Sequence, residues 1–274
     1  MKLTGHLRKM HATLGSPVEY ELPLDEQLEP LNPHIGQVIT LRATGQIHCV
    51  ACGRKTKKSY SQGHCYPCSQ SLASCDLCIM KPETCHYDEG TCRQPEWGEE
   101  HCMQAHYVYL ANSSGIKVGI TRQNQVPTRW IDQGASQALA ILKVKHRRLS
   151  GLVEVALKKH VSDRTDWRRM LKGTPEFVDL QAKRDELLAA TAHELAILRE
   201  QFGADSILEL DDRTAATLDY PVNEYPTKVS SFNFDKTPEI RATLMGIKGQ
   251  YLIFDKGVLN IRKFGGYEIE LETN

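Results

Sequence analysis

The sequence has no long hydrophobic run and no excess of charge of either sign. No apolar stretch in its 274 residues approaches the roughly 20 residues that a membrane-spanning helix requires. The amino-terminal stretch MKLTGHLRKMHATLG is positively charged but has no apolar segment after it, so a secretory signal peptide is not expected. A net charge of zero also argues against a uniformly basic nucleic-acid-binding protein. We therefore predict a globular, cytoplasmic protein with no membrane partner.

Cysteine is missing from most of the chain, because all nine cysteines lie between Cys49 and Cys102. A disulfide framework would be spread over the whole of a secreted domain, so this distribution does not indicate one. In a reducing compartment, clustered thiols are typical of metal binding. The sequence therefore predicts a metal-binding module, which we place at residues 49–106.

The most specific spacing in the sequence is that of the first four cysteines, in CVACGRKTKKSYSQGHCYPC. Cys49 and Cys52 form one C-x-x-C pair, and Cys65 and Cys68 form a second pair after twelve intervening residues. Each pair fits a tight turn that brings two sulfurs together, and a hairpin between the pairs would place them opposite one another. Four thiolates complete a tetrahedron and leave no position for water. We therefore predict a structural zinc site in a zinc-ribbon-like module.

A second group of possible ligands follows the first. Its five sulfurs, with the imidazoles of His86 and His101 nearby, exceed one tetrahedral shell, so spacing does not assign the ligands. A second zinc is our first interpretation, and an iron–sulfur cluster is an alternative because thiolates suit both. Buried thiols without a metal are a third reading. The predicted second site uses a subset of Cys75, Cys78, Cys85, Cys92, Cys102 and His106.

Charge is unevenly distributed along the chain. The segment from Tyr107 to Lys172 contains 13 Lys or Arg and 4 Asp or Glu, a net charge of +9, and the rest of the chain balances it. Such a concentration is typical of a surface that binds the phosphates of DNA or RNA. The alternative is a solvated helical face without a partner.

The same basic segment has a readable order of secondary structure. The β-prone runs YVYLA and KVGIT flank the turn residues NSSG, which predicts a hairpin over residues 107–121. A short helix is expected after Pro127, followed by a strand over residues 138–145. A longer helix is expected after Ser150, because apolar residues recur there at helical spacing.

This order of elements, with YVY at 107–109 and KVG at 117–119, resembles the GIY-YIG nuclease superfamily. The resemblance is particularly to the phage and bacterial branch whose second motif begins with lysine. Arg129 follows ten residues after the second motif, and Glu154 lies on the later helix. The similarity covers residues 107–171 and rests on the joint order of short motifs. The whole chain also resembles an uncharacterised bacterial family that joins a cysteine-rich segment to KVGITR and RWIDQGA, which implies no activity.

The resemblance implies roles for individual residues. Tyr109 would deprotonate or orient a water, Glu154 would hold a Mg²⁺ or Mn²⁺ ion, and Arg129 would stabilise the phosphoryl oxygens. Lys117 stands where other members have a tyrosine. The additional His or Tyr of many GIY-YIG nucleases has no clear equivalent, and the candidate, His146, is expected on a strand. The expected substrate-binding residues are Tyr107, Gly119, Arg122, Trp167 and Arg168.

These residues also have purely structural interpretations. Tyr109 fits an edge-strand aromatic that packs on the sheet, and Arg129 and Glu154 fit a salt bridge between two helices. Gly119 fits a close approach of backbones. Trp167, beside its neighbouring cations, suits base stacking but equally fits a ring buried beneath its helix.

The flanks predict further structure around this segment. Residues 176–205 contain a long amphipathic helix, expected over 177–203 with Gly203 as its end. Residues 206–274 predict a meander of about four strands, and residues 1–48 also favour strands. Neither terminal set has a full core alone, so we expect the two to join in one β-barrel-like unit.

The sequence thus predicts an α+β protein, with a small GIY-YIG-like α/β sandwich at residues 107–175 between a cysteine-rich module and terminal strands. Our leading functional hypothesis is metal-dependent phosphodiester hydrolysis, with the zinc module aiding nucleic-acid binding. One alternative is an inactive DNA- or RNA-binding module, and another is a metal or redox sensor that uses the second cysteine group. The sequence does not predict the oligomeric state.

Overall fold

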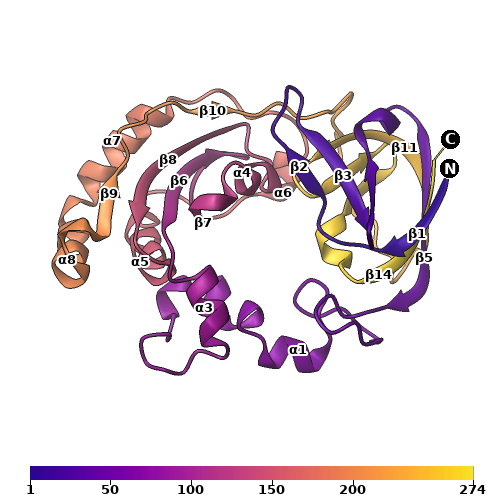
Figure 1. The fold of residues 1–274 in the computed structure, drawn as a ribbon. Coiled ribbons are helices and arrows are strands. Elements are labelled where there is room, and N and C mark those ends of the chain that lie inside the picture. Colours follow the sequence, from indigo (N-terminus) through magenta and orange to yellow (C-terminus); the bar gives the residue numbers. More distant parts are fainter. Residues whose placement is uncertain (274) are drawn as a thin grey trace.

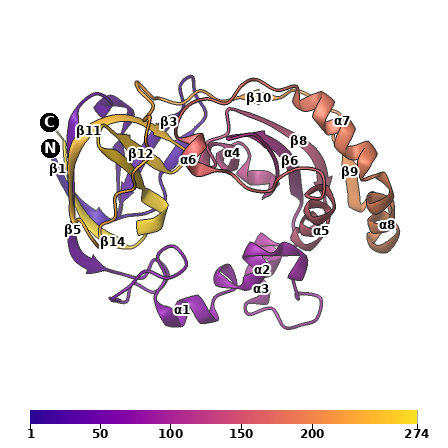
Figure 2. The same ribbon diagram turned by 180° about the vertical axis from the view of Figure 1, so that it is seen from behind.

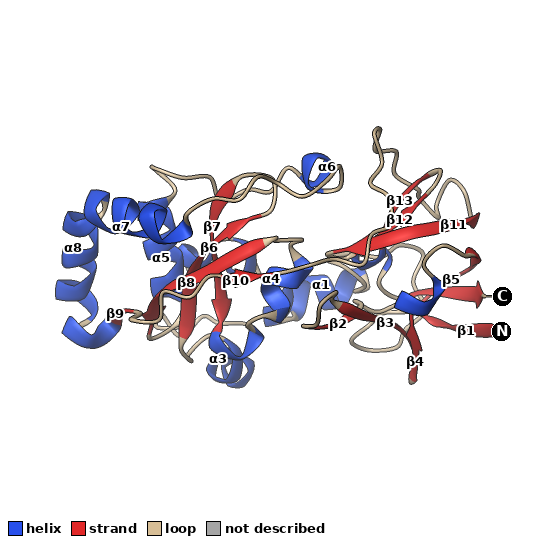
Figure 3. Cartoon of the chain, turned by 90° about the horizontal axis from the view of Figure 1, so that it is seen from above, coloured by secondary structure: helices blue, strands red, loops and turns tan. Residues whose placement is uncertain are grey.

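The computed structural model of the chain describes residues 1–273 and shows a mixed α+β fold with three antiparallel sheets (Figure 1). Seen from above, helices α7 and α8 lie at one end of the molecule and the terminal strands at the other, with the central sheet between them (Figure 3). No helix in residues 1–273 is long and apolar enough to cross a membrane.

A six-stranded sheet combines strands from both termini in the order β1-β14-β5-β11-β12-β13. Along β14 buried and half-buried residues alternate, as expected for a sheet with one face on the core. β1 and β13 remain as the two edges, so residues 1–273 contain no closed barrel and the barrel-like closure that the sequence suggested is wrong. The strands are β1 (Lys2–His6), β5 (Val38–Ile47), β11 (Glu239–Lys248), β12 (Tyr251–Phe254), β13 (Gly257–Asn260) and β14 (Tyr267–Glu272).

A small three-stranded sheet covers the buried face of the six-stranded one. It consists of β2 (His11–Thr13), β3 (Glu19–Leu24) and β4 (Gln27–Pro30) in sequential order. Tyr20 and Leu22 of β3 belong to the same hydrophobic cluster as Ile269 of β14. We call these two sheets the terminal unit.

The central sheet has the order β10-β8-β6-β7, with β9 added beside β8. The predicted hairpin is confirmed, because β6 and β7 pair antiparallel with Tyr109 opposite Gly119. Helix α4 lies between β7 and β8 in the chain, and α5 follows β8. The bounds are β6 (His106–Asn112), β7 (Ile116–Arg122), α4 (Thr128–Asp132), β8 (Gln137–Val144), α5 (Arg147–Leu157), β9 (Ile207–Glu209) and β10 (Ala216–Thr217).

Both faces of strand β6 are covered, which explains its unbroken apolar run. On one face Val108 and Leu110 belong to a cluster with Val153 of α5. On the other face Tyr109 belongs, with Trp130 of α4, to the large cluster that also fills the terminal unit. The central sheet and the terminal unit therefore share one continuous core.

The single long helix predicted over residues 177–203 is wrong, because the structure has two helices, α7 (Leu180–Ala190) and α8 (Ala192–Phe202). The Asp179 side chain caps the start of α7, so the preceding residues are not helical. Thr191, between the helices, donates a hydrogen bond to the backbone oxygen of Leu187 at 2.7 Å and leaves the α-helical conformation.

A second correction concerns His146. It lies at the N-cap of α5 rather than on a strand, and its Nδ1 accepts a hydrogen bond from the Leu149 backbone N–H at 3.3 Å.

The cysteine-rich segment, residues 49–106, runs along one side of the molecule from the end of β5 to α5 (Figures 1 and 2). It contains three short α-helices and little regular structure besides. Gly151 of α5 lets this segment approach closely, because a Cβ there would collide with Pro82 and Glu83. Its α-helices are α1 (Tyr66–Ser71), α2 (Leu77–Met80) and α3 (Pro95–His101).

Short helical turns complete the connections between these elements. Helix α6 (Trp167–Met170) follows α5. The 3₁₀ helices are η1 (Asn32–His34), η2 (Ala73–Cys75), η3 (Pro82–Thr84), η4 (Gln123–Gln125), η5 (Ala204–Ser206) and η6 (Ile261–Phe264).

We expect Gly119→Ala to destabilise the central sheet. A Cβ at this position would lie 2.6 Å from the Tyr109 ring and hydroxyl, and such overpacking costs about 1–3 kcal/mol. The free energy of unfolding in urea measures the effect. Tyr109→Leu in the same chain removes the colliding atoms, so the double variant should lose less stability than the sum of the two single variants. Simple additivity would show that Gly119 is not required by the tyrosine.

Candidate functional site

The first four cysteines converge as the spacing predicts. Their Sγ atoms all lie within 4.8 Å of one another, and those of Cys52 and Cys65 are 3.8 Å apart. Zinc bound by four thiolates at about 2.3 Å in a tetrahedron requires sulfurs about 3.8 Å apart. The group, which we call the four-cysteine site, therefore fits a zinc ion; its members are Cys49, Cys52, Cys65 and Cys68.

Local backbone geometry places these sulfurs. Cys65 is the N-cap of α1, so Cys68 lies in the first helical turn, three residues further on and on the same side. The other pair lies in a turn, where the Gly53 N–H donates to the Cys49 oxygen at 2.9 Å. Gly53 has a φ of +69°, a conformation that glycine adopts without strain.

The electrostatics of the four-cysteine site favour a bound cation. Burial raises the pKa of the Cys49 thiol, but backbone N–H groups of Cys52, Cys65 and Ala51 outweigh it and lower the pKa to about 6. The pKa of Cys68 is raised to about 12 by its hydrogen bonds with Cys65 and Cys52. Cys49 therefore loses its proton readily, and its negative charge disfavours deprotonation of the neighbouring thiols. A bound divalent metal would offset the repulsion between the thiolates.

The second group of cysteines does not assemble in the same way. Within residues 1–273 the compact group in this region is Asp76, Cys78 and His86. Asp76 is already engaged, because it forms an ion pair with Arg93 at 2.8 Å and caps helix α2. The sensor hypothesis, which uses this second group, therefore has no four-thiol cluster to support it among the second group's cysteines in residues 1–273. The predicted ligands outside this group are Cys75, Cys85, Cys92, Cys102 and His106.

His106 is fully buried in β6. Its Nδ1 lies 2.7 Å from the Gln104 oxygen, and its Nε2 has no hydrogen-bond partner in residues 1–273. Burial lowers its pKa to about 4, so the ring is neutral at physiological pH.

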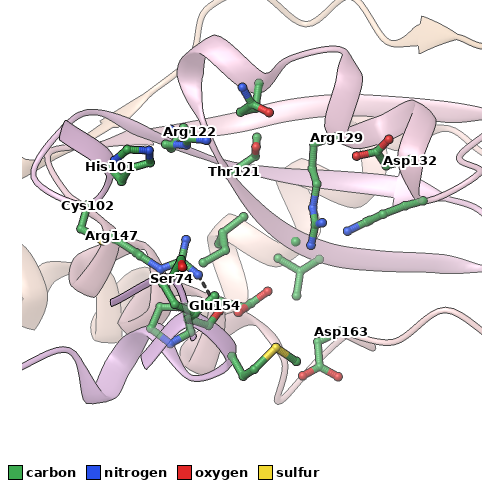
Figure 4. Close-up of a pocket in the computed structure, with 18 of the residues that line it drawn as sticks. Ser74, His101, Cys102, Thr121, Arg122, Arg129, Asp132, Arg147, Glu154 and Asp163 are labelled. Atoms are coloured by element: carbon green, nitrogen blue, oxygen red, sulfur yellow. Dashed lines mark hydrogen bonds between the residues drawn. The ribbon is translucent and has the colours of Figure 1, made fainter. Parts of the chain in front are cut away.

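A cavity of about 540 Å³ lies where the central sheet, the terminal unit and the cysteine-rich segment meet (Figure 4). We call it the pocket. Six of its side chains are Lys or Arg and three are Asp or Glu, so its walls carry net positive charge. The ionisable lining residues are Lys9, Lys117, Arg122, Arg129, Arg147, Arg262, Asp132, Glu154 and Asp163.

Three predicted site residues reach the pocket from different elements. Lys117 comes from β7, Arg129 from α4 and Glu154 from α5. β7 is an edge strand of the central sheet, so its residues can face the pocket without another strand in between. Gly119 and Arg122 of the same strand also line it. Figure 4 shows the Arg129 and Glu154 side chains extending toward the same space from opposite walls.

Burial perturbs the charges around the pocket. It lowers the pKa of Lys117 to about 8, with a further contribution from the nearby Arg129. It raises the pKa of Glu154 to about 7, and the charge of Asp163 adds to that shift. Residues 1–273 contain no salt bridge between Arg129 and Glu154, so the structural ion pair that the sequence allowed is not present.

Tyr109, in contrast, is sealed in the interior. Its side chain is 0% exposed and its hydroxyl donates to Gln133 Oε1 at 3.0 Å. Gln133 and Gly119 line the pocket, whereas Tyr109 lies one layer behind them. Burial raises its pKa, and the nearby Arg129 partly offsets this. The structure thus offers no position where Tyr109 touches a water in the pocket. β6 is also an inner strand, so the edge-strand reading fails too.

The other predicted substrate-binding residues lie outside the pocket wall. Tyr107 is half-buried on β6. The Trp167 ring stacks on Tyr251 of the terminal unit, with centroids 5.7 Å apart and planes at 5°. The Arg168 guanidinium lies 4.2 Å from the Trp167 ring centroid. Trp167 also packs on a small hydrophobic cluster that contains Met170, which favours its structural interpretation.

Several pocket residues were not predicted from sequence. Lys9 forms an ion pair with Asp132, and Arg262 reaches the same pocket from the carboxy-terminal part of the chain. No local pattern marks either residue, because their proximity depends on the pairing of terminal strands. Arg147 belongs to the basic segment, and its Nη2 donates to the Ile79 oxygen at 2.6 Å. The charge count could have identified Arg147 but not the other two.

Residues 36–269 match the family model described as "Protein of unknown function (DUF2797)". The chain belongs to this family. Comparisons with curated proteins and with solved structures gave no match. The DUF2797 match spans the four-cysteine site and every ionisable pocket residue except Lys9. The predicted likeness to an uncharacterised family is thus confirmed, whereas the GIY-YIG relationship stays a prediction.

We expect the purified chain to contain about one zinc ion at the four-cysteine site, by the ligand rule for structural zinc. Cys65→Ser removes a buried ligand and should abolish zinc binding, as measured by mass spectrometry of the metal content. Cys92→Ser, which changes a cysteine outside the site, should keep the zinc. Equal zinc content in the two variants would contradict the assignment.

Glu154→Gln should change stability in a pH-dependent manner. The folded pKa of about 7 exceeds the ordinary glutamate value of 4.5, so the folded chain binds the proton more tightly and loses stability as pH rises from about 4.5 to 7. The Glu154→Gln variant does not lose this stability, because its amide has no proton to release. At pH 4, below both pKa values, the two chains should be similar, and at pH 8 the variant should gain on the order of 2–3 kcal/mol. Urea unfolding without added divalent metal measures this, and Glu200→Gln, at an exposed position, is the matched control.

Proposed function

We propose that the chain is a divalent-metal-dependent phosphodiester hydrolase that acts on nucleic acid. The observation that supports this function best is the convergence of Lys117, Arg129 and Glu154 on one concave, positively charged pocket. The three residues are far apart in sequence, and each comes from a different element of the central sheet region.

The basic side chains are suited to a phosphodiester. Arg122, Arg129 and Arg147 all line the pocket, so they can surround an anion rather than contact it from one side. Positive charge held in a partly dry site stabilises the charge that develops on phosphoryl oxygens during hydrolysis. A solvated helical face would spread these cations over a convex surface instead.

The acidic side chains are suited to a hard cation. Glu154 and Asp163 both line the pocket, and the charge of Asp163 raises the pKa of Glu154. Two carboxylates that repel one another are stabilised when a divalent metal binds between them, and oxygen ligands suit Mg²⁺ and Mn²⁺. Such a metal would supply a polarised water and neutralise charge on the phosphate. Glu154 and Asp163 are its candidate ligands, while Arg129 and Lys117 hold and orient the phosphate.

The order of elements adds support. The hairpin β6–β7, helix α4, strand β8 and helix α5 follow one another as the GIY-YIG resemblance implies. Within this order Arg129 lies on the first helix and Glu154 on the second, and both side chains reach the pocket.

A second candidate function is nucleic-acid binding without cleavage. The burial of Tyr109 favours it, because the resemblance assigns to this residue the contact with the attacking water. Lys117 also replaces the other tyrosine of the implied site. The same pocket would then hold a phosphodiester without hydrolysing it.

Cleavage of labelled single- and double-stranded DNA and RNA with Mg²⁺ or Mn²⁺ tests the proposal. Wild-type protein should cleave at least one of them. Arg129→Ala should reduce the rate by about a hundredfold, the usual loss of one group that stabilises transition-state charge. Glu154→Ala should abolish metal-dependent cleavage. Arg164→Ala and Glu200→Ala change exposed residues outside the pocket and should leave the rate unchanged.

Cleavage that survives Glu154→Ala would locate the activity elsewhere on the chain. Tight, salt-sensitive binding without cleavage by the wild type, lost on Arg129→Ala, would establish the second candidate instead.

A further inference from the structure

The cysteine-rich segment gives the pocket a wall of a different chemical kind. Helix α3 contributes Trp97 and His101, and helix α2 contributes Ile79 and Met80. The Trp97 and His101 rings are parallel, with centroids 4.2 Å apart and planes at 8°. Met80 is 80% exposed. The pocket thus has a basic part, lined by Lys and Arg side chains, and an aromatic and apolar part, lined by helices α2 and α3.

The local structure fixes the plane of the indole ring. Trp97 and His101 are four residues apart on α3, so they lie on the same side of the helix. His101 Nδ1 lies 3.0 Å from the Trp97 backbone oxygen, which holds the imidazole against the indole. An aromatic surface that is already oriented loses little conformational entropy when a ligand stacks on it.

Core packing does not account for this tryptophan. The chain has three. Trp130 is 7% exposed within the large core cluster, and Trp167 packs on the terminal unit. Trp97 is half-buried and belongs to none of the hydrophobic clusters of residues 1–273. It is one of the residues that line the pocket.

The neighbours of this ring define what it can bind. Figure 4 shows His101 and Arg122 on the same side of the pocket, with Arg129 and Arg147 on its other walls. A bare phosphate would use the cations and leave the rings unoccupied. A ligand with an anionic group and a flat ring a short distance apart would use both, and each unit of a nucleic acid has that form.

We propose that Trp97 and His101 form a stacking subsite for an unpaired nucleobase, so that the pocket selects single-stranded or locally unpaired nucleic acid. A base in a duplex is stacked on both faces and cannot offer one to a side chain. This inference rests on the proposed function, because the phosphodiester site supplies the phosphate contacts. It adds that the pocket also recognises an unpaired base of the strand.

The test compares two oligonucleotides of equal length and charge, one of deoxythymidine and one of abasic tetrahydrofuran units, bound by the full zinc-loaded chain without Mg²⁺ or Mn²⁺. Wild type should bind the base-containing strand about tenfold more tightly, the scale of one stacked base. Trp97→Ala should remove most of this preference, and Trp97→Phe should keep much of it. Phe177→Ala, which removes an 80% exposed aromatic outside the pocket, should change nothing.

Thermal unfolding and zinc content of each variant show whether it is folded. Equal wild-type affinity for the two strands would overturn the stacking subsite and leave the phosphodiester site intact, provided that Arg129→Ala still weakens both. Failure to bind either strand would instead count against the proposed function. Equally tight binding of a duplex of the same length would also contradict the stacking subsite, because bases in a duplex are not free to stack on Trp97.

Discussion

The fold holds several charged groups partly out of water around one cavity. Lys117 and Glu154 both have pKa values displaced toward neutrality by burial, and neither is relieved by a direct ion pair in the described chain. Such an arrangement costs folding energy that an apolar lining would not. Sequences retain costs of this kind where a ligand offsets them. The electrostatic strain of the pocket therefore adds support to the proposal that the chain binds a charged ligand there.

One continuous core makes this pocket a property of the whole chain. The cluster that contains Tyr109 and Trp130 also contains Leu7 and Ile269 of the terminal unit. Helix α4, which carries Arg129, is therefore held between two sheets. The cysteine-rich segment closes the remaining side through its contacts with α5. A zinc ion at the four-cysteine site would stabilise this segment, because residues 49–105 contribute none of the side chains in the hydrophobic clusters.

Sequence reasoning succeeded where the signal is local. The Cys49 to Cys68 spacing and the NSSG turn each specify a geometry within about twenty residues, by the rules for zinc ligands and hairpins. It failed where the outcome depends on packing. The burial of Tyr109 follows from the terminal unit covering that face of β6, which no pattern in YVYLA reveals. The break at Thr191 accompanies a hydrogen bond from its hydroxyl to the Leu187 backbone oxygen, which the periodicity of the sequence does not reveal. Lys9 and Arg262 meet in the pocket because strands distant in sequence pair.

The pairing of β1 and β5 with β14 has a consequence for the order of events during synthesis. Leu3 and Leu41 both lie beside Leu271, so β1 has no paired strand until β14 is synthesised, and β5 has none until β11 is synthesised. Contacts between such distant residues form slowly and leave apolar edges open meanwhile. The central hairpin, whose partners are adjacent, can form at once. The nascent chain therefore carries β1 and β5 without their partner strands through most of translation, and a chaperone that shields them would matter more here than for a domain whose strands pair in sequence order.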